Sequence, residues 1–442
     1  MNRFMAGTLW ILLYLVVVLA PLFLMMIRPT PPGRSFWVEF SIALGFVGLT
    51  QIAVQFLLIA RYRRITVPYG IDIIVQYHRQ IAMMALVLLL AHPAILMIYN
   101  PELLKLLNPL GGTWASRFGL ASTVALVLLV VLSLYRQQLG LNYERWRLTH
   151  TLLGIAALVF AHAHVSLAGE YPYKYLNTVW KQVFWKVFGA VMISSLVYLR
   201  LIKPALQKRK RYRVTEVKEE RGDNLTLVLK PVGHPGLRFA PGQFAWLKLG
   251  PTPYTIAEHP FSFSSSAETQ GRLEFGIKAL GDFTRSLKNV PVGTDAYLDG
   301  PHGAFSIDLI PAAGYVLIAG GIGITPMLSF LKTMADREDV RPVLLIYGDK
   351  RWESMAYCEE LDALTQKLNL KIVYVLEQPP EGWHGETGFI TEELLARNLP
   401  QEKIKREFFV CGPPVMMDAV QEALVKLGYP LEHIHTERFS LV

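Results

Sequence analysis

The sequence predicts a multidomain membrane protein in which a six-helix transmembrane bundle precedes a small antiparallel β-barrel and an α/β domain with a parallel sheet. Three observations support this fold class. Long apolar runs are confined to the first 200 residues, although 52% of all 442 residues are hydrophobic and the mean hydropathy is +0.31. Short alternating strands follow, and from Gly314 apolar strands alternate with amphipathic helices. We expect domains at 1–203, 212–310 and 311–442, with a charged linker at 204–211.

Six apolar runs in the first part of the chain are each close to the ~20 residues that a helix needs to cross a bilayer. The expected spans are 7–27, 37–60, 76–98, 118–135, 148–168 and 181–202. No small-residue cleavage site follows the first run, so we interpret it as a retained helix rather than a signal peptide. The lipid bilayer is therefore an expected partner of this chain.

Positive charge indicates which side of the membrane is cytoplasmic. Six spans put both chain ends on one side, and the basic clusters at 61–64 and 208–213 fall on that side. The positive-inside rule then predicts a multi-pass protein of the inner (plasma) membrane with cytoplasmic termini. This topology explains most of the +9 net charge, and no pattern of a nucleic-acid reader is present. Cys358 and Cys411 both fall in the cytoplasmic part, which excludes a disulfide framework.

Two pairs of histidines lie within the apolar runs at identical spacing: His78 with His92, and His150 with His164. Fourteen residues return a helical side chain to within about 40° of its starting direction and advance it by about 21 Å. Each pair therefore lies on one face of its helix, with one histidine towards each membrane surface. Neutral imidazoles that face each other between helices are suited to axial ligation of haem iron. The spacing predicts two stacked b-type haems.

The direction of the helices assigns the histidines to the two haems. The third and fifth spans both run outward, so His78 and His150 should share the inner haem, and His92 and His164 the outer one. A single intramembrane histidine could instead form only an interhelical hydrogen bond, but two equal spacings favour ligation. His162 lies roughly 120° around the helix from His150 and is a reserve candidate for His164.

A glycine-rich turn joins the first apolar strand of the last domain to a helix. Gly320, Gly321 and Gly323 in this turn would let a pyrophosphate approach the backbone at a helix N-terminus. Their order differs from the GxGxxG fingerprint, and a tight strand–helix connection without a ligand is the alternative interpretation. The neighbouring motifs bear on this choice.

Five motifs in the second half occur in the order that one family shows. They are HPFSFSS at 259–265, LGDFT at 280–284, GPHGAF at 300–305, GGIGITP at 320–326 and CGPP at 411–414. With the four membrane histidines, they make the chain resemble the NADPH oxidases and ferric reductases, from about residue 37 to the end. The bacterial members are the most similar. The resemblance implies a transmembrane flavocytochrome b that binds FAD, two haem b groups and NADPH or NADH.

The resemblance also implies roles for individual residues. The flavin would be held by His259, Pro260, Phe261 and Ser262, and its pyrophosphate by Lys278, Gly281 and Thr284. The nicotinamide cofactor would contact Gly320, Gly321, Gly323, Thr325, Pro326, Cys411, Gly412 and Pro413. Thr325 and Cys411 would face the nicotinamide, with Cys411 near its C4 atom, shaping the pocket rather than acting as a nucleophile. Phe439 resembles a C-terminal aromatic that stacks on the flavin, although three residues follow it here.

Lys350 and Arg351 follow the next expected strand, where a ribose 2′-phosphate would bind. A double positive charge there favours NADPH, and a surface charge pair explains it equally well. The preference between NADPH and NADH therefore stays open.

The expected function is transmembrane electron transfer from cytosolic NAD(P)H to a small-molecule acceptor on the outer face. Oxygen and ferric chelates are the candidate acceptors, with a quinone or a partner protein as the alternative. Leu96 occupies a position where animal oxidases carry a further histidine, which weakens oxygen without excluding it. A haem-sensing or haem-storage membrane protein is the competing class. No obligatory protein partner is evident from the sequence.

Overall fold

The computed structural model describes residues 3–26, 35–62, 71–108, 110–168, 179–400 and 405–438. The chain divides into two compact units. We call Met1–Lys203 the helical unit and Pro204–Val442 the sheet unit.

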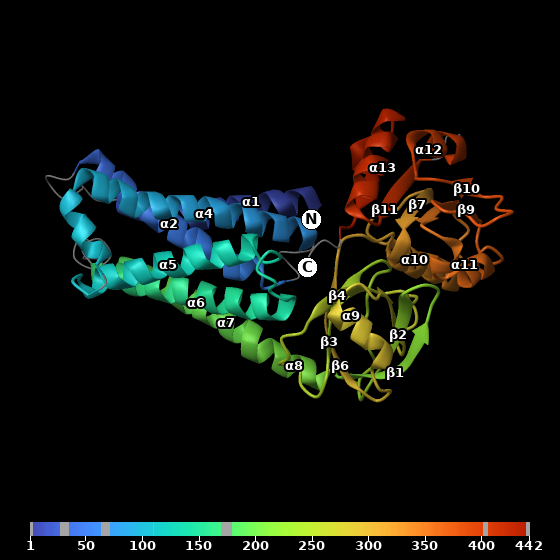
Figure 1. The fold of residues 1–442 in the computed structure, drawn as a ribbon, viewed down its shortest axis with the longest axis horizontal. Coiled ribbons are helices and arrows are strands. Elements are labelled where there is room, and N and C mark those ends of the chain that lie inside the picture. The colour runs from blue at the N-terminus through green and yellow to red at the C-terminus, as the bar shows by residue number, and fades with distance from the viewer. Residues whose placement is uncertain are drawn as a thin grey trace. The chain divides into compact units, whose positions relative to one another are not determined.

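The helical unit consists of long apolar helices that run alongside one another (Figure 1). They are α1 (Arg3–Met26), α2 (Phe36–Leu58), α4 (Ile71–Tyr99), α5 (Trp114–Leu134), α6 (Tyr143–Ala168) and α7 (Val179–Val197), with short helices η1 (Pro101–Leu107) and η3 (Tyr198–Ile202). Ser35 and Thr113 begin α2 and α5 by accepting hydrogen bonds from first-turn backbone N–H groups. Among the described residues, five helices are long and apolar enough to cross a membrane, and 7–23 forms a shorter apolar helix. The expected series of apolar helices is confirmed, while the sixth span stays a prediction.

The first sheet of the sheet unit is antiparallel and curled. Its strands are β1 (Tyr212–Glu219), β2 (Asn224–Pro231), β3 (Phe244–Leu249), β4 (His259–Ser262), β5 (Leu273–Lys278) and β6 (Asp295–His302), in the order β4-β3-β6-β1-β2-β5. A bridge between Phe263 and Phe275 connects the chain after β4 to β5, so the two edges of the sheet meet. This confirms the expected antiparallel domain. The short helices α8 (Lys203–Arg209), α9 (Asp282–Ser286) and η4 (Leu287–Asn289) flank it.

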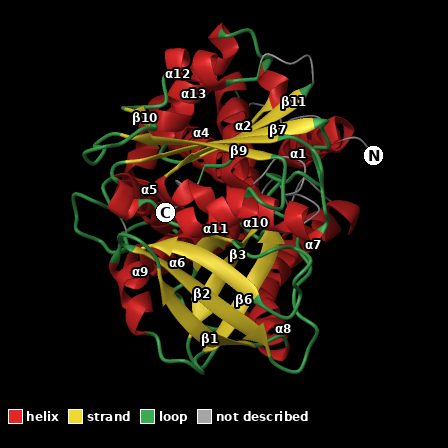
Figure 2. Ribbon diagram, turned by 90° about the vertical axis from the view of Figure 1, so that its right-hand side faces the viewer, coloured by secondary structure: helices red, strands yellow, loops and turns green. Residues whose placement is uncertain are grey.

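The second sheet is parallel and carries helices on both faces, as expected (Figure 2). Its strands are β7 (Gly314–Gly320), β8 (Val343–Asp349), β9 (Leu370–Leu376), β10 (Glu386–Thr387), β11 (Arg406–Cys411) and β12 (Ile434–Thr436), in the order β10-β9-β8-β7-β11-β12. The connecting helices are η5 (Gly321–Gly323), α10 (Ile324–Asp336), η6 (Trp352–Ser354), α11 (Cys358–Leu364), α12 (Glu392–Asn398), α13 (Pro414–Lys426) and η7 (Leu431–His433).

Successive residues of the central strand β7 face opposite sides of this sheet. Tyr315 and Leu317 pack with α10 and α11, whereas Val316 and Ile318 pack with α12 and α13. The chain adds β8 and β9 on one side of β7 and later places β11 on the other side. The order of the strands therefore reverses between β7 and β11, which is where open α/β sheets bind ligands.

Candidate functional site

The helical unit brings the four histidines together as two facing pairs. The ring centres of His78 and His150 are 6.1 Å apart, and those of His92 and His164 are 6.4 Å apart. A metal ion between two imidazoles requires ring centres roughly 6 Å apart, because each metal–nitrogen bond is about 2 Å long and each ring radius is roughly 1 Å. Both pairs therefore fit a bis-histidine metal centre.

Each of the four rings is oriented by a hydrogen bond at Nδ1. His78 Nδ1 lies 2.6 Å from Gln55 Oε1, and His150 Nδ1 lies 3.0 Å from Ser133 Oγ. His92 Nδ1 lies 2.9 Å from the backbone oxygen of Ser41, and His164 Nδ1 lies 2.8 Å from that of Ala115. An imidazole that donates Nδ1–H presents the lone pair of Nε2 to a metal. The chemistry of the pairs thus fits haem iron as well as their spacing does.

Glycines on neighbouring helices allow two of the rings to pack closely. A Cβ atom at Gly45 of α2 would lie 3.2 Å from the ring of His92, and one at Gly119 of α5 would lie 2.9 Å from His164 Nδ1. The reserve candidate His162 packs instead beside Gly189 of α7, 3.4 Å from where a Cβ would stand. His164 is therefore the residue that the fold pairs with His92.

In the sheet unit, the structure brings two of the flavin-side motifs together. The motif 259–262 forms β4, which pairs with the β-barrel strand β3. The His259 ring stacks on Phe283 of the LGDFT motif, with ring centres 4.0 Å apart and an interplanar angle of 20°. Pro260 and Phe261 are partly exposed, while the Ser262 side chain is buried. Two segments that are distant in sequence thus border one site.

The proposed pyrophosphate loop is partly exposed and contains Lys278 and the acidic Asp282, which is followed by Arg285. Lys278 ends β5, and Thr284 lies in the first turn of α9. Thr284 Oγ1 accepts hydrogen bonds from the backbone N–H groups of Leu280 and Gly281, at 3.0 and 2.9 Å. No atom lies within 4 Å of where a Cβ of Gly281 would stand. Open space beside a lysine and a short helix start fits the phosphates of FAD.

The nicotinamide-side residues gather at the reversal point between β7 and β11. A Cβ atom at Gly323 would lie 2.3 Å from the backbone oxygen of Cys411, and one at Gly320 would lie 2.4 Å from Met416 Sδ. A Cβ atom at Gly412 would lie 2.7 Å from Met416 Cε and 3.0 Å from the backbone nitrogen of Gly320. Close packing against backbone atoms therefore requires Gly323, whereas the nearest obstacle at Gly320 and Gly412 is the flexible end of the Met416 side chain. The exception is Gly321, whose φ is +53° and where an added Cβ atom would lie 3.9 Å from Asp349 Oδ2.

Thr325 and Cys411 are both buried at this point. Thr325 Oγ1 donates to the backbone oxygen of Ile322 at 2.9 Å, and its neighbour Pro326 is buried in α10. Burial raises the pKa of the Cys411 thiol well above its usual range, with a smaller contribution from the Glu437 carboxylate. Cys411 is thus a neutral thiol and suits a role in shaping the pocket. Pro413 is the N-cap of α13, and Phe439 lies outside the described residues.

The end of β8 carries an acidic residue that sequence reasoning missed. Asp349 Oδ1 accepts hydrogen bonds from Ser354 Oγ and from the backbone N–H of Lys350, both at 2.6 Å. Its other oxygen faces Gly321, as noted above. Arg351 Nε donates to Gln378 Oε1 at 2.9 Å. An acid at this strand end is the usual acceptor for ribose hydroxyls, so the signal was present in the sequence.

A second missed group joins the β-barrel to the parallel sheet. Tyr357 adopts φ +65°, a strained conformation for a residue other than glycine, and is buried. Its hydroxyl lies 2.9 Å from Thr226 Oγ1, which donates to Glu220 Oε1 at 2.8 Å. A Cβ at Gly276 of β5 would lie 2.5 Å from the Tyr357 hydroxyl and 2.6 Å from Thr325 Oγ1. The contact therefore holds Thr325 against the barrel.

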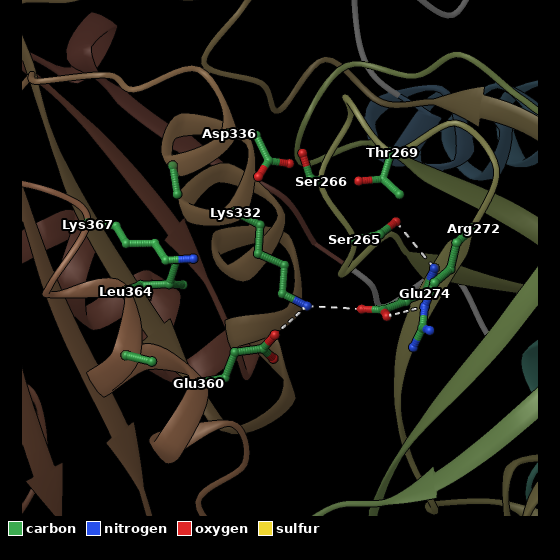
Figure 3. Close-up of a pocket in the computed structure, with 12 residues that line it drawn as sticks. Ser265, Ser266, Thr269, Arg272, Glu274, Lys332, Asp336, Glu360, Leu364 and Lys367 are labelled. Carbon is green, nitrogen blue, oxygen red and sulfur yellow. Dashed lines mark hydrogen bonds and ion pairs between the residues drawn. The ribbon is translucent and has the colours of Figure 1, made fainter.

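A polar cleft of about 450 Å³ lies between β5 and the helices α10 and α11 (Figure 3). Lys332 of α10 crosses it to pair with Glu274 of β5 at 2.9 Å and with Glu360 of α11 at 2.8 Å. Cationic and acidic side chains are balanced around the cleft, and none of the expected cofactor residues lines it. We interpret it as a charged seam between the two sheets rather than as a cofactor site.

Three family models match the chain in the order that the fold shows. They are a ferric reductase-like transmembrane component at 44–161, an FAD-binding domain at 209–306 and an oxidoreductase NAD-binding domain at 317–422. The chain has the architecture of the ferric reductase-like, NADPH oxidase-type flavocytochromes. The curled antiparallel sheet is its FAD domain, and the parallel sheet is its NAD domain.

Individual proteins to which the chain is similar are named as reductases. The chain is 33% identical to the reductase component of propane 2-monooxygenase from Rhodococcus jostii, over 52% of this chain and 63% of that protein. It is 34% identical to NADH-cytochrome b5 reductase 1 from Debaryomyces hansenii, over 37% of this chain and 60% of that protein. The chain thus spans less than two thirds of these relatives. With the domain matches, they support an NAD(P)H-dependent oxidoreductase.

One solved structure among the similar ones is the cytochrome b5 reductase domain of nitrate reductase from Ulva prolifera. It is 21% identical, with a TM-score of 0.46, and the match covers 52% of this chain and 97% of that domain.

Proposed function

We propose that this protein transfers electrons from cytosolic NAD(P)H through FAD and two b-type haems to oxygen or a ferric chelate on the outer face of the membrane. The observation that carries the proposal is the pair of facing imidazoles at each of two levels, with all four Nδ1 atoms hydrogen-bonded. Such burial of polar groups in apolar helices is costly and marks a functional site.

The bound groups supply hydride donation, the division of an electron pair into single electrons and single-electron transport. The residues of the chain supply placement. His78 with His150, and His92 with His164, would hold the two irons on facing helices. The loop with Lys278 would neutralise the pyrophosphate of FAD. Cys411 and Thr325 would confine the nicotinamide at the reversal point of the parallel sheet.

The proposed protein has six spans, cytoplasmic termini and the domains 1–203, 204–211, 212–310 and 311–442. Aromatic side chains at both ends of the helices support the proposal that these helices cross the bilayer. Trp37 at the start of α2 stacks on Tyr99 at the end of α4, with ring centres 5.8 Å apart. Near the other ends of these helices, Tyr62 stacks on Tyr198 at 5.5 Å. Tryptophan and tyrosine favour the two surfaces of a bilayer. The basic residues at 61–64 and 208–213 assign the second end to the cytoplasm.

Purified full-length protein, supplied with FAD, tests this function. Anaerobic NADH or NADPH should reduce two haems, as followed by their absorption spectra. Oxygen or a ferric chelate should then reoxidise them, and the faster acceptor is the substrate. Haems that stay oxidised with both nicotinamides would contradict the relay and favour haem storage or sensing, which predicts binding without turnover. Reoxidation only by a quinone or a protein would favour the alternative acceptors.

A further inference from the structure

The two histidine pairs differ in what orients them. The ring of His164 is held by the backbone oxygen of Ala115. The ring of His92 is held by the backbone oxygen of Ser41, 2.9 Å from Nδ1, and also by the Ser41 hydroxyl, 3.0 Å from Nδ1. The rings of His78 and His150 are held by side chains, Gln55 and Ser133. Under the proposed function and topology, a backbone oxygen accepts from each ring of the outer haem site, whereas two replaceable side chains hold the rings of the inner site.

The hydrogen bonds around Ser133 determine the direction of its bond to His150. Ser133 Oγ donates its single proton to the backbone oxygen of Leu129 at 2.7 Å. It also accepts from Trp146 Nε1 at 3.2 Å. The hydroxyl can therefore meet His150 only as an acceptor, so His150 Nδ1 carries the proton and Nε2 has the free lone pair.

Gln55 is suited to the same task on the opposite helix. Its side chain is 6% exposed, and its Oε1 is the acceptor at 2.6 Å from His78 Nδ1. An amide oxygen accepts a proton-bearing Nδ1 and cannot donate to it. The contact thus selects the same tautomer for His78 as Ser133 selects for His150.

We propose that Gln55 and Ser133 are positioning residues for the inner haem and that they set its reduction potential independently of the outer haem. This inference rests on the proposed function. A strong acceptor at Nδ1 makes an imidazole a more basic ligand, which stabilises ferric iron. Loss of the acceptor should raise the midpoint potential of one haem, and a negatively charged acceptor should lower it.

The test is a spectroelectrochemical titration of the full-length protein, with the ratio of haem to protein measured on the same samples. Gln55→Leu should shift one of the two haem components upward, or weaken binding of one haem by about 10–100-fold, while the other component stays unchanged. Gln55→Glu should shift the same component downward. Gln51→Leu is the matched control, because Gln51 lies one turn earlier on α2, is 5% exposed and contacts Tyr14 rather than a histidine.

Ser133→Ala keeps the proposal testable if the Gln55 variants do not accumulate. It should affect the same component as Gln55→Leu. Its control is Ser122→Ala on the same helix, where the hydroxyl donates to the backbone oxygen of Ala157 at 2.8 Å. Unchanged potentials in all variants, or equal shifts of both haems, would overturn the inference. Wild-type protein without two haems would instead overturn the proposed function itself.

Discussion

The helical unit and the sheet unit carry their candidate functional residues in different ways. In the helical unit, four histidines stand out because they lie within apolar runs, and each is oriented through a hydrogen bond at Nδ1. In the sheet unit, the expected residues lie in turns whose glycines also serve packing, as Gly323 against Cys411 shows. A polar motif within a membrane span therefore indicates a functional site more directly than a motif in the sheet unit, because polar groups are costly to bury in apolar surroundings.

Removal of an outer ligand should have the largest effect. His92→Ala should lose one of the two haems and reduce transmembrane electron transfer to background, because the outer iron loses an axial bond. Electron transfer from NAD(P)H through the bound FAD to a soluble electron acceptor that oxidises the flavin directly should remain. Haem content and reduction of an acceptor outside sealed vesicles measure the two effects. His162→Ala is the control, and transmembrane reduction that persisted in His92→Ala would contradict the assignment.

Gly323→Ala tests the packing role of the glycine turn. The added Cβ would lie 2.3 Å from the Cys411 backbone oxygen, so we expect a loss of about 1–3 kcal/mol in the free energy of unfolding of the sheet unit. Gly271→Ala is the control, because no atom lies within 4 Å of its added Cβ. Thermal unfolding of the full chain gives the measurement. Equal stability of the two variants would show that packing does not require Gly323.

Asp349→Asn tests the nicotinamide side of the comparison. Loss of the carboxylate beside Gly321 should reduce repulsion of a ribose 2′-phosphate. The kcat/KM for NADPH relative to NADH should therefore rise about tenfold, or about 1.4 kcal/mol. Arg351→Ala should move this ratio in the opposite direction. An unchanged ratio in Asp349→Asn would place the ribose away from the end of β8.

The smallest effect concerns the contact between the two sheets. Burial raises the pKa of Glu220 above its ordinary 4.5, more than its hydrogen bond from Thr226 lowers it. The protonated form is thus favoured in the folded protein, and its stabilising contribution is lost as the pH rises through the raised pKa. The melting temperature of Glu220→Gln minus that of wild type should therefore increase as the pH is raised from about 4 to about 7. The exposed Glu219→Gln is the control, and its difference from wild type should not change with pH in this way. The same pH dependence in both variants would contradict the effect of Glu220 burial on stability.

Most of the fold follows from local pattern. Apolar runs and alternating strands predicted the helices, the antiparallel sheet and the parallel sheet, because each has its own hydrophobic period. The strand β4 carries no such pattern, since four residues that include Pro260 are too short for a clear alternation. Its place is decided by pairing with β3 and by the stack of His259 on Phe283.

The sequence by itself determined the candidate site residues, because the fourteen-residue spacing and the motif order are properties of the chain. Only the tertiary structure decided their partners. Gln55 and Ser133 hold histidines that are 23 and 17 residues away, and Tyr357 reaches Thr226 across 131 residues. Asp349 meets Gly321 only because β7 and β8 are neighbours in the sheet. Such contacts join segments that are far apart in the sequence, so the hydrophobic pattern of a single helix or strand cannot predict them. They form only when the helices and sheets pack.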